Sequence, residues 1–171
     1  MQGVAVLGST GSIGTAALRV LARHPDRFRI VALTAFAKQD QLGAQAAAFR
    51  PDFVSLVGGG REGWRSGTES LVEAATLPDA DIVLNAVVGA AGLEATLAAL
   101  GAGKRVALAN KETLVSAGEL VLEAARRGGG EIVPVDSEHS AVLQCVTGRP
   151  KADLARIILT ASGGPFHNWD A

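Results

Sequence analysis

Several features that mark other classes of protein are scarce in this 171-residue sequence. Cys145 is the single cysteine, so no disulfide can form within the chain, and a reducing, cytoplasmic location is expected. The formal net charge of -1 argues against nucleic acid or an anionic membrane as the main partner. Small molecules are therefore the partners that the composition favours.

Long hydrophobic runs are missing as well. The most apolar long stretch, residues 82–100, is interrupted by Asn85, Gly89 and Glu94, which predicts a strand, a turn and a helix rather than a membrane span. No N-terminal leader is expected, because the first strand pattern begins at residue 3. Hydrophobic residue types are abundant, at 48%, and glycine occurs 21 times. This composition suits one domain with a sizeable core, or one domain plus part of another.

A glycine-rich stretch near the N-terminus organises the rest of the chain. Residues 8–14 read G-S-T-G-S-I-G and join the apolar stretch Val4–Leu7 to a helical pattern from Thr15 to Arg23. G-x-x-G-x-x-G is a variant of the dinucleotide fingerprint, in which glycines permit a tight turn and close approach to a pyrophosphate. N–H groups at the helix start then face the anion, although a turn that binds nothing has the same sequence. Further donors are hydroxyl groups of the loop: Ser9, Thr10 and Ser12.

Strand and helix patterns alternate along the chain. Strands are expected at residues 4–7, 28–33, 53–57, 81–86, 106–109 and 131–135, with a further short one at 64–66. Helices are expected at residues 15–23, 39–49, 68–76, 93–101, 117–127 and 138–146. This alternation predicts an α/β fold, a Rossmann-like, doubly wound and mostly parallel sheet with helices on both faces. Residues 147–150 have the composition of a linker, and a new element begins at residue 157.

The end of the second strand distinguishes between the two nicotinamide dinucleotides. In NAD-binding folds an acidic residue there holds the ribose 2′-hydroxyl. Here the strand continues L-T-A-F-A-K over residues 33–38, and no acid occurs before Asp40. The missing carboxylate favours NADP, and Lys38 is a candidate partner for the 2′-phosphate. A solvated lysine at a helix start is the alternative interpretation.

Three polar clusters follow later strands, where ligands of such sheets bind. Residues 110–112, N-K-E, suit an anionic or carbonyl substrate, or else form a turn with a helix cap. Residues 136–140, D-S-E-H-S, place Asp136 and Glu138 where both carboxylates can offer oxygens to a hard cation, or where acids favour a helix start. Residues 161–165, A-S-G-G-P, offer N–H groups and the Ser162 hydroxyl to a phosphate, or form an ordinary turn.

The order of motifs resembles one enzyme family over the whole chain. The motifs are G-S-T-G-S-I-G at 8–14, V-G-A-A-G at 88–92, A-N-K-E at 109–112, P-V-D-S-E-H-S at 134–140 and S-G-G-P-F at 162–166. Together they resemble the 1-deoxy-D-xylulose 5-phosphate reductoisomerases, NADPH- and metal-dependent enzymes of the non-mevalonate isoprenoid pathway. The resemblance implies a cytoplasmic enzyme that is a homodimer at full length.

The resemblance also implies roles for particular residues. Those implied to bind NADPH are Thr10, Gly11, Ser12, Ile13, Asn110 and Glu112, with Lys38 added from the end of the second strand. Those implied to bind Mn²⁺ or Mg²⁺, with Co²⁺ as a further option, are Asp136 and Glu138. Those implied to contact the phosphorylated sugar are Lys111, Ser137, Glu138 and Ser162.

The implied chemistry has two steps. The metal chelates the carbonyl and hydroxyl oxygens of 1-deoxy-D-xylulose 5-phosphate, and the carbon skeleton rearranges to a branched aldehyde phosphate. NADPH then reduces this aldehyde to 2-C-methyl-D-erythritol 4-phosphate, while Lys111 stabilises the charge that develops on oxygen.

The sequence departs from the family pattern in three places. F-A-K-Q stands at residues 36–39, where the family usually carries glycine or a small polar residue and then asparagine. The segment between Val57 and Trp64 is shorter than in the family, so one crossover helix is expected to be missing. The family has a further catalytic region with a third carboxylate metal ligand and a lid. We therefore expect an NADPH-binding domain at 1–148, the start of a catalytic domain at 149–171, and no turnover by these 171 residues alone.

Two other functions remain open from the residues. Another NADP-dependent oxidoreductase, such as a semialdehyde dehydrogenase, shares the strand-turn-helix start but needs a nucleophilic cysteine. Cys145 falls at an apolar position within an expected helix, which disfavours that role. A nucleotide-binding fragment without turnover is the third possibility.

Overall fold

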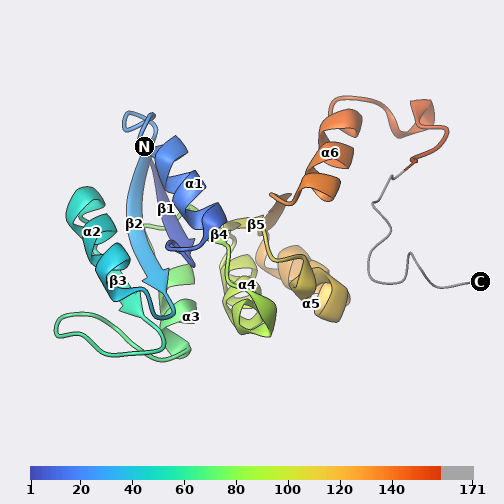
Figure 1. Ribbon diagram of the computed structural model, residues 1–171. Coiled ribbons are helices and arrows are strands. Elements are labelled where there is room, and N and C mark those ends of the chain that lie inside the picture. Colours follow the sequence, from blue (N-terminus) through green and yellow to red (C-terminus); the bar gives the residue numbers. More distant parts are fainter. Residues whose placement is uncertain (159–171) are drawn as a thin grey trace, which may run out of the picture. The chain divides into compact units, whose positions relative to one another are not determined.

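The computed structural model describes residues 1–158, which form two compact units (Figure 1). The first unit is Met1–Asp136, and the second begins at Ser137. The domain boundary expected at residue 148 stays a prediction.

A six-stranded sheet, with strand order β3-β2-β1-β4-β5-β6, forms the centre of the first unit. The strands are β1 (Gln2–Leu7), β2 (Phe28–Ala35), β3 (Phe53–Leu56), β4 (Ile82–Asn85), β5 (Arg105–Leu108) and β6 (Glu131–Pro134). Every neighbouring pair is parallel, so the carboxyl ends of all six strands lie at one edge of the sheet. The strand order is that of the doubly wound dinucleotide-binding fold, which confirms the expected fold class.

Helices join each strand of this sheet to the next. They are α1 (Ser12–Leu21), α2 (Gln39–Phe49), α3 (Glu69–Ala75), α4 (Leu93–Gly101) after the short 3₁₀ turn η1 (Gly89–Gly92), and α5 (Lys111–Gly128). Helix α3, expected at 68–76, joins β3 to β4, and no helix lies between Val57 and Trp64, the segment from which a crossover helix was expected to be missing. The expected strand at 64–66 is reduced to a single bridge between Ser55 and Arg65, within the loop that leads to α3.

Two hydrophobic cores lie on the two faces of the sheet. Val4 and Val6 of β1 pack in a cluster with Leu18 of α1 and Leu42 of α2. The alternate residues of β1 join a second cluster with α3, α4 and α5. Successive side chains of a strand point to opposite faces, so β1 is buried from both sides and helices cover both.

Two helices begin earlier than their sequence pattern predicts. Helix α1 begins at Ser12, within the glycine stretch, rather than at Thr15. Helix α5 begins at Lys111 rather than Ala117, and Ala117 itself has non-helical angles, φ -145° and ψ 30°. The periodic pattern therefore located the part of α5 beyond the kink and missed the part before it.

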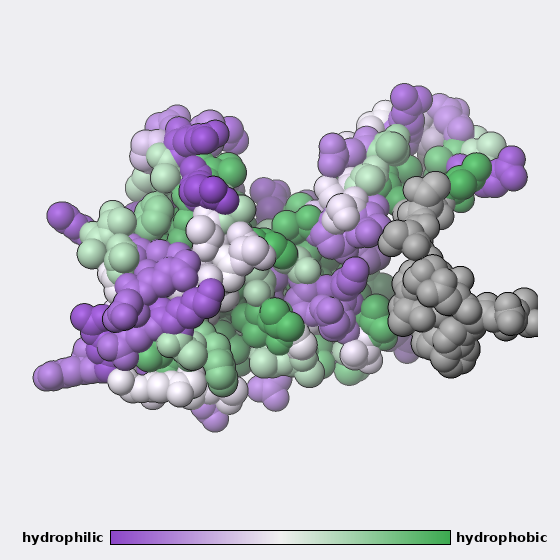
Figure 2. All heavy atoms as spheres, in the orientation of Figure 1, coloured by the Kyte–Doolittle hydropathy of each residue, from purple (hydrophilic) through white to green (hydrophobic). Residues whose placement is uncertain are grey.

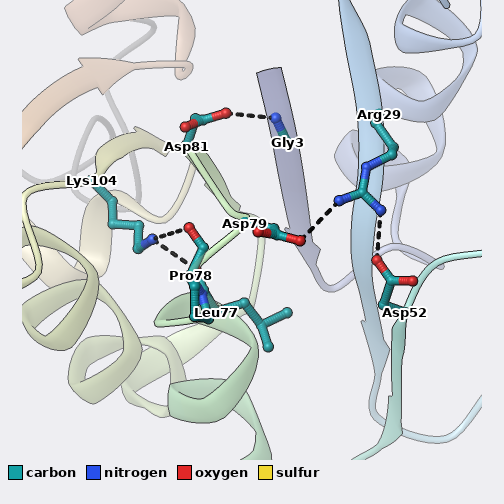
Figure 3. Close-up of polar contacts among 8 residues, drawn as sticks. All are labelled: Gly3, Arg29, Asp52, Leu77, Pro78, Asp79, Asp81 and Lys104. Atoms are coloured by element: carbon teal, nitrogen blue, oxygen red, sulfur yellow. Dashed lines mark hydrogen bonds and ion pairs between the residues drawn. The ribbon is translucent and has the colours of Figure 1, made fainter. Parts of the chain in front are cut away.

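An ion cluster lies near the strand starts, at the end of the sheet away from the glycine loop (Figure 3). The Arg29 guanidinium lies 2.6 Å from a carboxylate oxygen of Asp52 and 3.1 Å from one of Asp79. The hydrogen bond with Asp52 is the main cause that raises the pKa of Arg29. All three side chains are well exposed to solvent, so this cluster adds little stability.

Backbone contacts complete the same end of the sheet (Figure 3). The Gly3 N–H donates to a carboxylate oxygen of Asp81 at 2.8 Å, and the Lys104 ammonium donates to the Leu77 carbonyl at 2.7 Å. A Cβ at Gly3 would lie 1.7 Å from the Asp79 carbonyl oxygen, so only glycine fits there. These groups lie at the amino ends of the strands, and the glycine loop lies at the opposite edge of the sheet.

The second unit consists, over its described part, of α6 (Ser137–Val146) and the 3₁₀ turn η2 (Lys151–Asp153). Cys145 lies in the last turn of α6 and is exposed, which corrects the expected apolar position.

No helix within residues 1–158 combines the length and apolar character needed to cross a membrane. Residues 82–100 form β4, η1 and most of α4, as predicted. On the face that Figure 2 shows, hydrophilic and hydrophobic residues are intermixed.

Candidate cofactor-binding site

The loop after β1 is shaped by two glycines that no other residue can replace. Gly8 has a φ of +80°, and a Cβ there would lie 2.7 Å from the Ala86 carbonyl oxygen. A Cβ at Gly14 would lie 2.4 Å from the Gly8 carbonyl oxygen. Gly11 differs, because its added Cβ would come no closer than 3.4 Å to that oxygen. The chain's own packing thus requires Gly8 and Gly14, whereas glycine at 11 leaves open space at the start of α1.

Some backbone donors of the loop are used internally and others point outward. The N–H groups of Gly8 and Ser9 both donate to the Thr34 carbonyl of β2, at 3.1 and 2.8 Å. Helix geometry leaves the N–H groups of the first residues of α1, from Ser12 to Gly14, without an intrahelical acceptor. Gly11, Ser12 and Ile13 are also exposed. This helix start can therefore receive an anion, as the sequence predicts.

Helix α2 braces the glycine loop through a glutamine that the sequence analysis did not identify. The Ser9 hydroxyl donates to Gln45 Oε1 at 2.7 Å, and Gln45 Nε2 donates to the Ser9 carbonyl at 3.0 Å. Gln41, one turn earlier, donates to the Thr15 hydroxyl at 3.3 Å. The expectation that the Ser9 hydroxyl serves an anion is therefore wrong, because Ser9 is fully buried and bonded to Gln45. Gln41 and Gln45 are four residues apart and so lie on the same face of α2, but nothing in the sequence relates that face to the glycine loop.

Lys38 lies beside the same loop. It precedes α2, its side chain is exposed, and its Nζ is 3.5 Å from the Thr10 carbonyl oxygen. The ammonium group is thus close to the glycine loop and to the end of β2, with no acidic residue between Thr34 and Gln39. This position suits a phosphate on the ribose that binds at the end of β2.

A pocket of about 430 Å³ opens next to the loop, at the carboxyl ends of the strands. The residues that line it come from the glycine loop, the end of β2 and the residue after it, the segment from β3 into α3, and the segment after β4: Gly8, Thr10, Gly11, Thr34, Ala35, Phe36, Val57, Thr68, Leu71, Ala86, Val87, Val88 and Ala91. Most of these side chains are apolar. An apolar pocket that adjoins an anion-binding helix start fits a nucleotide, with its base in the pocket and its phosphates at the loop.

Asn110 joins the end of β5 to the loop after β4. Its Nδ2 donates to the carbonyls of Val87 and Gly89, both at 2.6 Å, and its Oδ1 accepts from the Thr113 N–H at 3.3 Å. Asn110 therefore acts as the N-cap of α5 and holds in place a loop that lines the pocket. Lys111 and Glu112 follow in the first turn of α5, and both are exposed.

Asn85 supports the same loop from inside the fold. It is fully buried at the end of β4, and its Nδ2 donates to the Gly92 carbonyl and to the Thr96 hydroxyl. Its Oδ1 accepts from the Val87 N–H at 3.1 Å. The sequence analysis noted Asn85 only as a polar residue within the apolar stretch 82–100 and did not identify this supporting role.

The residues expected to bind a metal lie on both sides of the division between the two units. Asp136 is the last residue of the first unit, while Ser137 and Glu138 begin α6 in the second. The Ser137 hydroxyl donates to a carboxylate oxygen of Glu138 at 2.8 Å. Carboxylates suit a hard cation, but no group of three or more His, Cys, Asp or Glu side chains gathers within residues 1–158. Ser162 lies outside the described residues.

Comparisons with known proteins give a consistent result. The family model of 1-deoxy-D-xylulose 5-phosphate reductoisomerase matches residues 4–61 and 59–118, and the model of the C-terminal domain of that enzyme matches residues 132–171. The first two matches meet in the loop between β3 and α3, where the sequence appeared shorter than in the family. The reductoisomerase of Symbiobacterium thermophilum is 50% identical, over 96% of this chain and 47% of the relative.

Solved structures agree. A reductoisomerase from Zymomonas mobilis in complex with NADPH superposes with a TM-score of 0.87 at 40% identity, over 99% of this chain and 48% of that one. A reductoisomerase in complex with NADPH, fosmidomycin and magnesium has a TM-score of 0.81 at 45% identity, over 86% of this chain and 40% of that one. The chain thus spans about half the length of the relatives that it matches. With family models that together match most of its residues, the chain belongs to the 1-deoxy-D-xylulose 5-phosphate reductoisomerase family.

Proposed function

We propose that this chain is the NADPH-binding part of an enzyme that isomerises and reduces 1-deoxy-D-xylulose 5-phosphate to 2-C-methyl-D-erythritol 4-phosphate. The observation that carries the proposal is the exposed start of α1, held open by Gly8, Gly11 and Gly14 beside an apolar pocket. Membership of the family supplies the reaction. The relatives with solved structures include one in complex with NADPH and one with NADPH, fosmidomycin and magnesium.

In this proposal the pyrophosphate of NADPH lies at Thr10–Ile13, where backbone N–H groups and the dipole of α1 favour an anion. Lys38 pairs with the 2′-phosphate. Asn110 keeps the loop after β4 in position beside the cofactor, and Glu112 provides a further contact from the first turn of α5.

Asp136 and Glu138 would hold the metal, which we propose to be Mg²⁺ or Mn²⁺, with Co²⁺ as a further option. When bound, the cation polarises the carbonyl of the substrate. Lys111, exposed at the start of α5, donates to the oxygen on which negative charge develops. Ser137, Glu138 and Ser162 hold the phosphorylated sugar. We further propose that the whole enzyme is a cytoplasmic homodimer.

Calorimetric titration with NADPH and NADH tests the cofactor assignment. We expect NADPH to bind more tightly, and Lys38→Ala to weaken NADPH by about tenfold, the worth of one charge-assisted contact, without changing NADH. Arg19→Ala is the matched control. It also removes one positive charge, but Arg19 lies about 10 Å along α1 from the start of that helix, where the anion is proposed to bind. Equal affinities for the two dinucleotides, or a preference for NADH, would overturn the assignment.

A further inference from the structure

Phe36 lies at the mouth of the pocket, directly after β2. It lines the pocket, although 73% of its surface is exposed to solvent. It is the one aromatic residue among those that line this pocket. Its neighbours there include Val57 and Leu71, so the ring extends an apolar wall that begins inside the pocket.

The position of the Phe36 ring is set by the backbone that follows β3. The Gly58 N–H donates to the Phe36 carbonyl at 2.8 Å. A Cβ at Gly58 would lie 3.1 Å from both the Cε2 and the Cζ of the ring, so the ring packs directly on the glycine backbone. Gly58 thus supports one side of the ring, and the rest of the ring stays open.

The pocket relates this ring to the phosphate-binding loop. Thr10 and Gly11 line the same pocket as Phe36. A dinucleotide whose pyrophosphate lies at the loop therefore extends its adenosine toward the end of β2, where Phe36 stands. A flat base is the ligand group that gains most from an open aromatic ring, because every base has a π-face that can stack.

We propose that Phe36 is a cofactor-binding residue that stacks against the adenine of NADPH. The proposal rests on the proposed NADPH function and adds to it the residue that holds the base. It also gives a role to the F-A-K-Q segment at residues 36–39, which departs from the family pattern. Lys38 and Phe36 then act on the same half of NADPH, one on the 2′-phosphate and the other on the base.

The test uses NADPH and adenosine 2′,5′-bisphosphate, which carries the adenine and the 2′-phosphate but no nicotinamide. We expect Phe36→Ala and Phe36→Leu to weaken both ligands by about tenfold, as measured by calorimetry. Phe36→Tyr keeps the ring and should bind both ligands as the unaltered chain does. Leucine keeps the apolar character without the ring, so the Leu and Tyr variants separate stacking from simple apolar contact.

Val20→Ala is the control, because Val20 is 56% exposed on α1 and does not line the pocket. In Phe36→Trp the indole fluorescence, relative to the unaltered chain, should fall when the bisphosphate binds. Unchanged affinity of Phe36→Leu for the bisphosphate would overturn the role of Phe36 and leave the NADPH assignment intact. Failure of the unaltered chain to bind either ligand would overturn both proposals.

Discussion

At the scale of single residues, the loop after β1 contains two glycines that packing requires, Gly8 and Gly14, and one that packing does not require, Gly11. Gly14→Val would place side-chain atoms inside the backbone of Gly8 and Ser9, since even a Cβ would lie 2.4 Å from the Gly8 oxygen. We expect a loss of at least about 2 kcal/mol in the free energy of unfolding, together with loss of NADPH binding. Thermal unfolding and calorimetry measure the two effects.

Gly11→Ala is the matched variant. Gly11 has φ -76° and ψ 173°, angles that alanine adopts, and its added Cβ meets only an ordinary contact. The unfolding free energy should therefore change by no more than about 0.5 kcal/mol, while NADPH binds at least about tenfold more weakly because the methyl group occupies space at the helix start. Unaltered affinity in this variant would mean that the pyrophosphate does not approach Gly11.

Gln45 makes a prediction of a different kind, because it braces the loop from α2 without facing the pocket. Gln45→Ala leaves the fully buried Ser9 without its side-chain partner, and we expect a loss of about 1–3 kcal/mol in unfolding free energy. Gln41→Ala should cost less, because Gln41 makes one longer bond to the half-buried Thr15. Chemical denaturation of both variants checks this, and equal losses would contradict the bracing role of Gln45.

Sequence reasoning located the glycines of the loop but missed the hydrogen bonds between Ser9 and Gln45 that hold the loop against α2. A glycine's role follows from local backbone chemistry, which a short motif displays directly. Gln45 lies 36 residues from Ser9, and only the pairing of β1 with β2 brings α2 alongside the loop. Such a contact depends on the tertiary fold, so no local pattern could have indicated it.

At the scale of elements, the loop after β4 is held by asparagines from two neighbouring strand ends. Asn110→Asp keeps an oxygen that can cap α5 but sets a carboxylate against the carbonyls of Val87 and Gly89. We expect the variant to lose about 1–3 kcal/mol of unfolding free energy and to bind NADPH more weakly, since Val87 lines the pocket. Glu119→Gln, an exposed change on the same helix, is the control for thermal unfolding and calorimetry. A variant as stable as the unaltered chain would refute the loop-holding role.

The element boundaries show where periodicity succeeds and where it fails. Short apolar stretches predicted all six strands. The bounds of α2 followed from its alanine content and the stop at Arg50-Pro51, and the end of α4 from Gly101 and Gly103. The start of α5 was missed, because the cap at Asn110 and the kink at Ala117 interrupt the pattern. The N-K-E motif was correctly placed at a strand end. The helix that begins at Lys111 was not predicted, because its start depends on the hydrogen bond from the Thr113 N–H to Asn110.

At the scale of the whole molecule, the chain carries a complete sheet for a nucleotide but spans only 47% of a relative such as the Symbiobacterium thermophilum enzyme. Its two expected metal ligands belong to different compact units, and the described residues gather no larger set of ligands. A hard cation takes about six oxygen ligands, so two carboxylates give a weak site rich in water. Catalysis also needs a closed site that excludes water.

A polypeptide of these 171 residues should therefore bind NADPH, bind Mg²⁺ or Mn²⁺ weakly, and show no detectable reduction of 1-deoxy-D-xylulose 5-phosphate. The assay is the loss of NADPH absorbance, with the Zymomonas mobilis reductoisomerase as the positive control. A steady, substrate-dependent loss that a chelator abolishes would contradict the prediction. In that case Asp136→Ala and Glu138→Ala should each abolish the activity, because each removes half of the carboxylate ligands that this chain is proposed to supply. Turnover that survives both changes would show that the metal is held elsewhere.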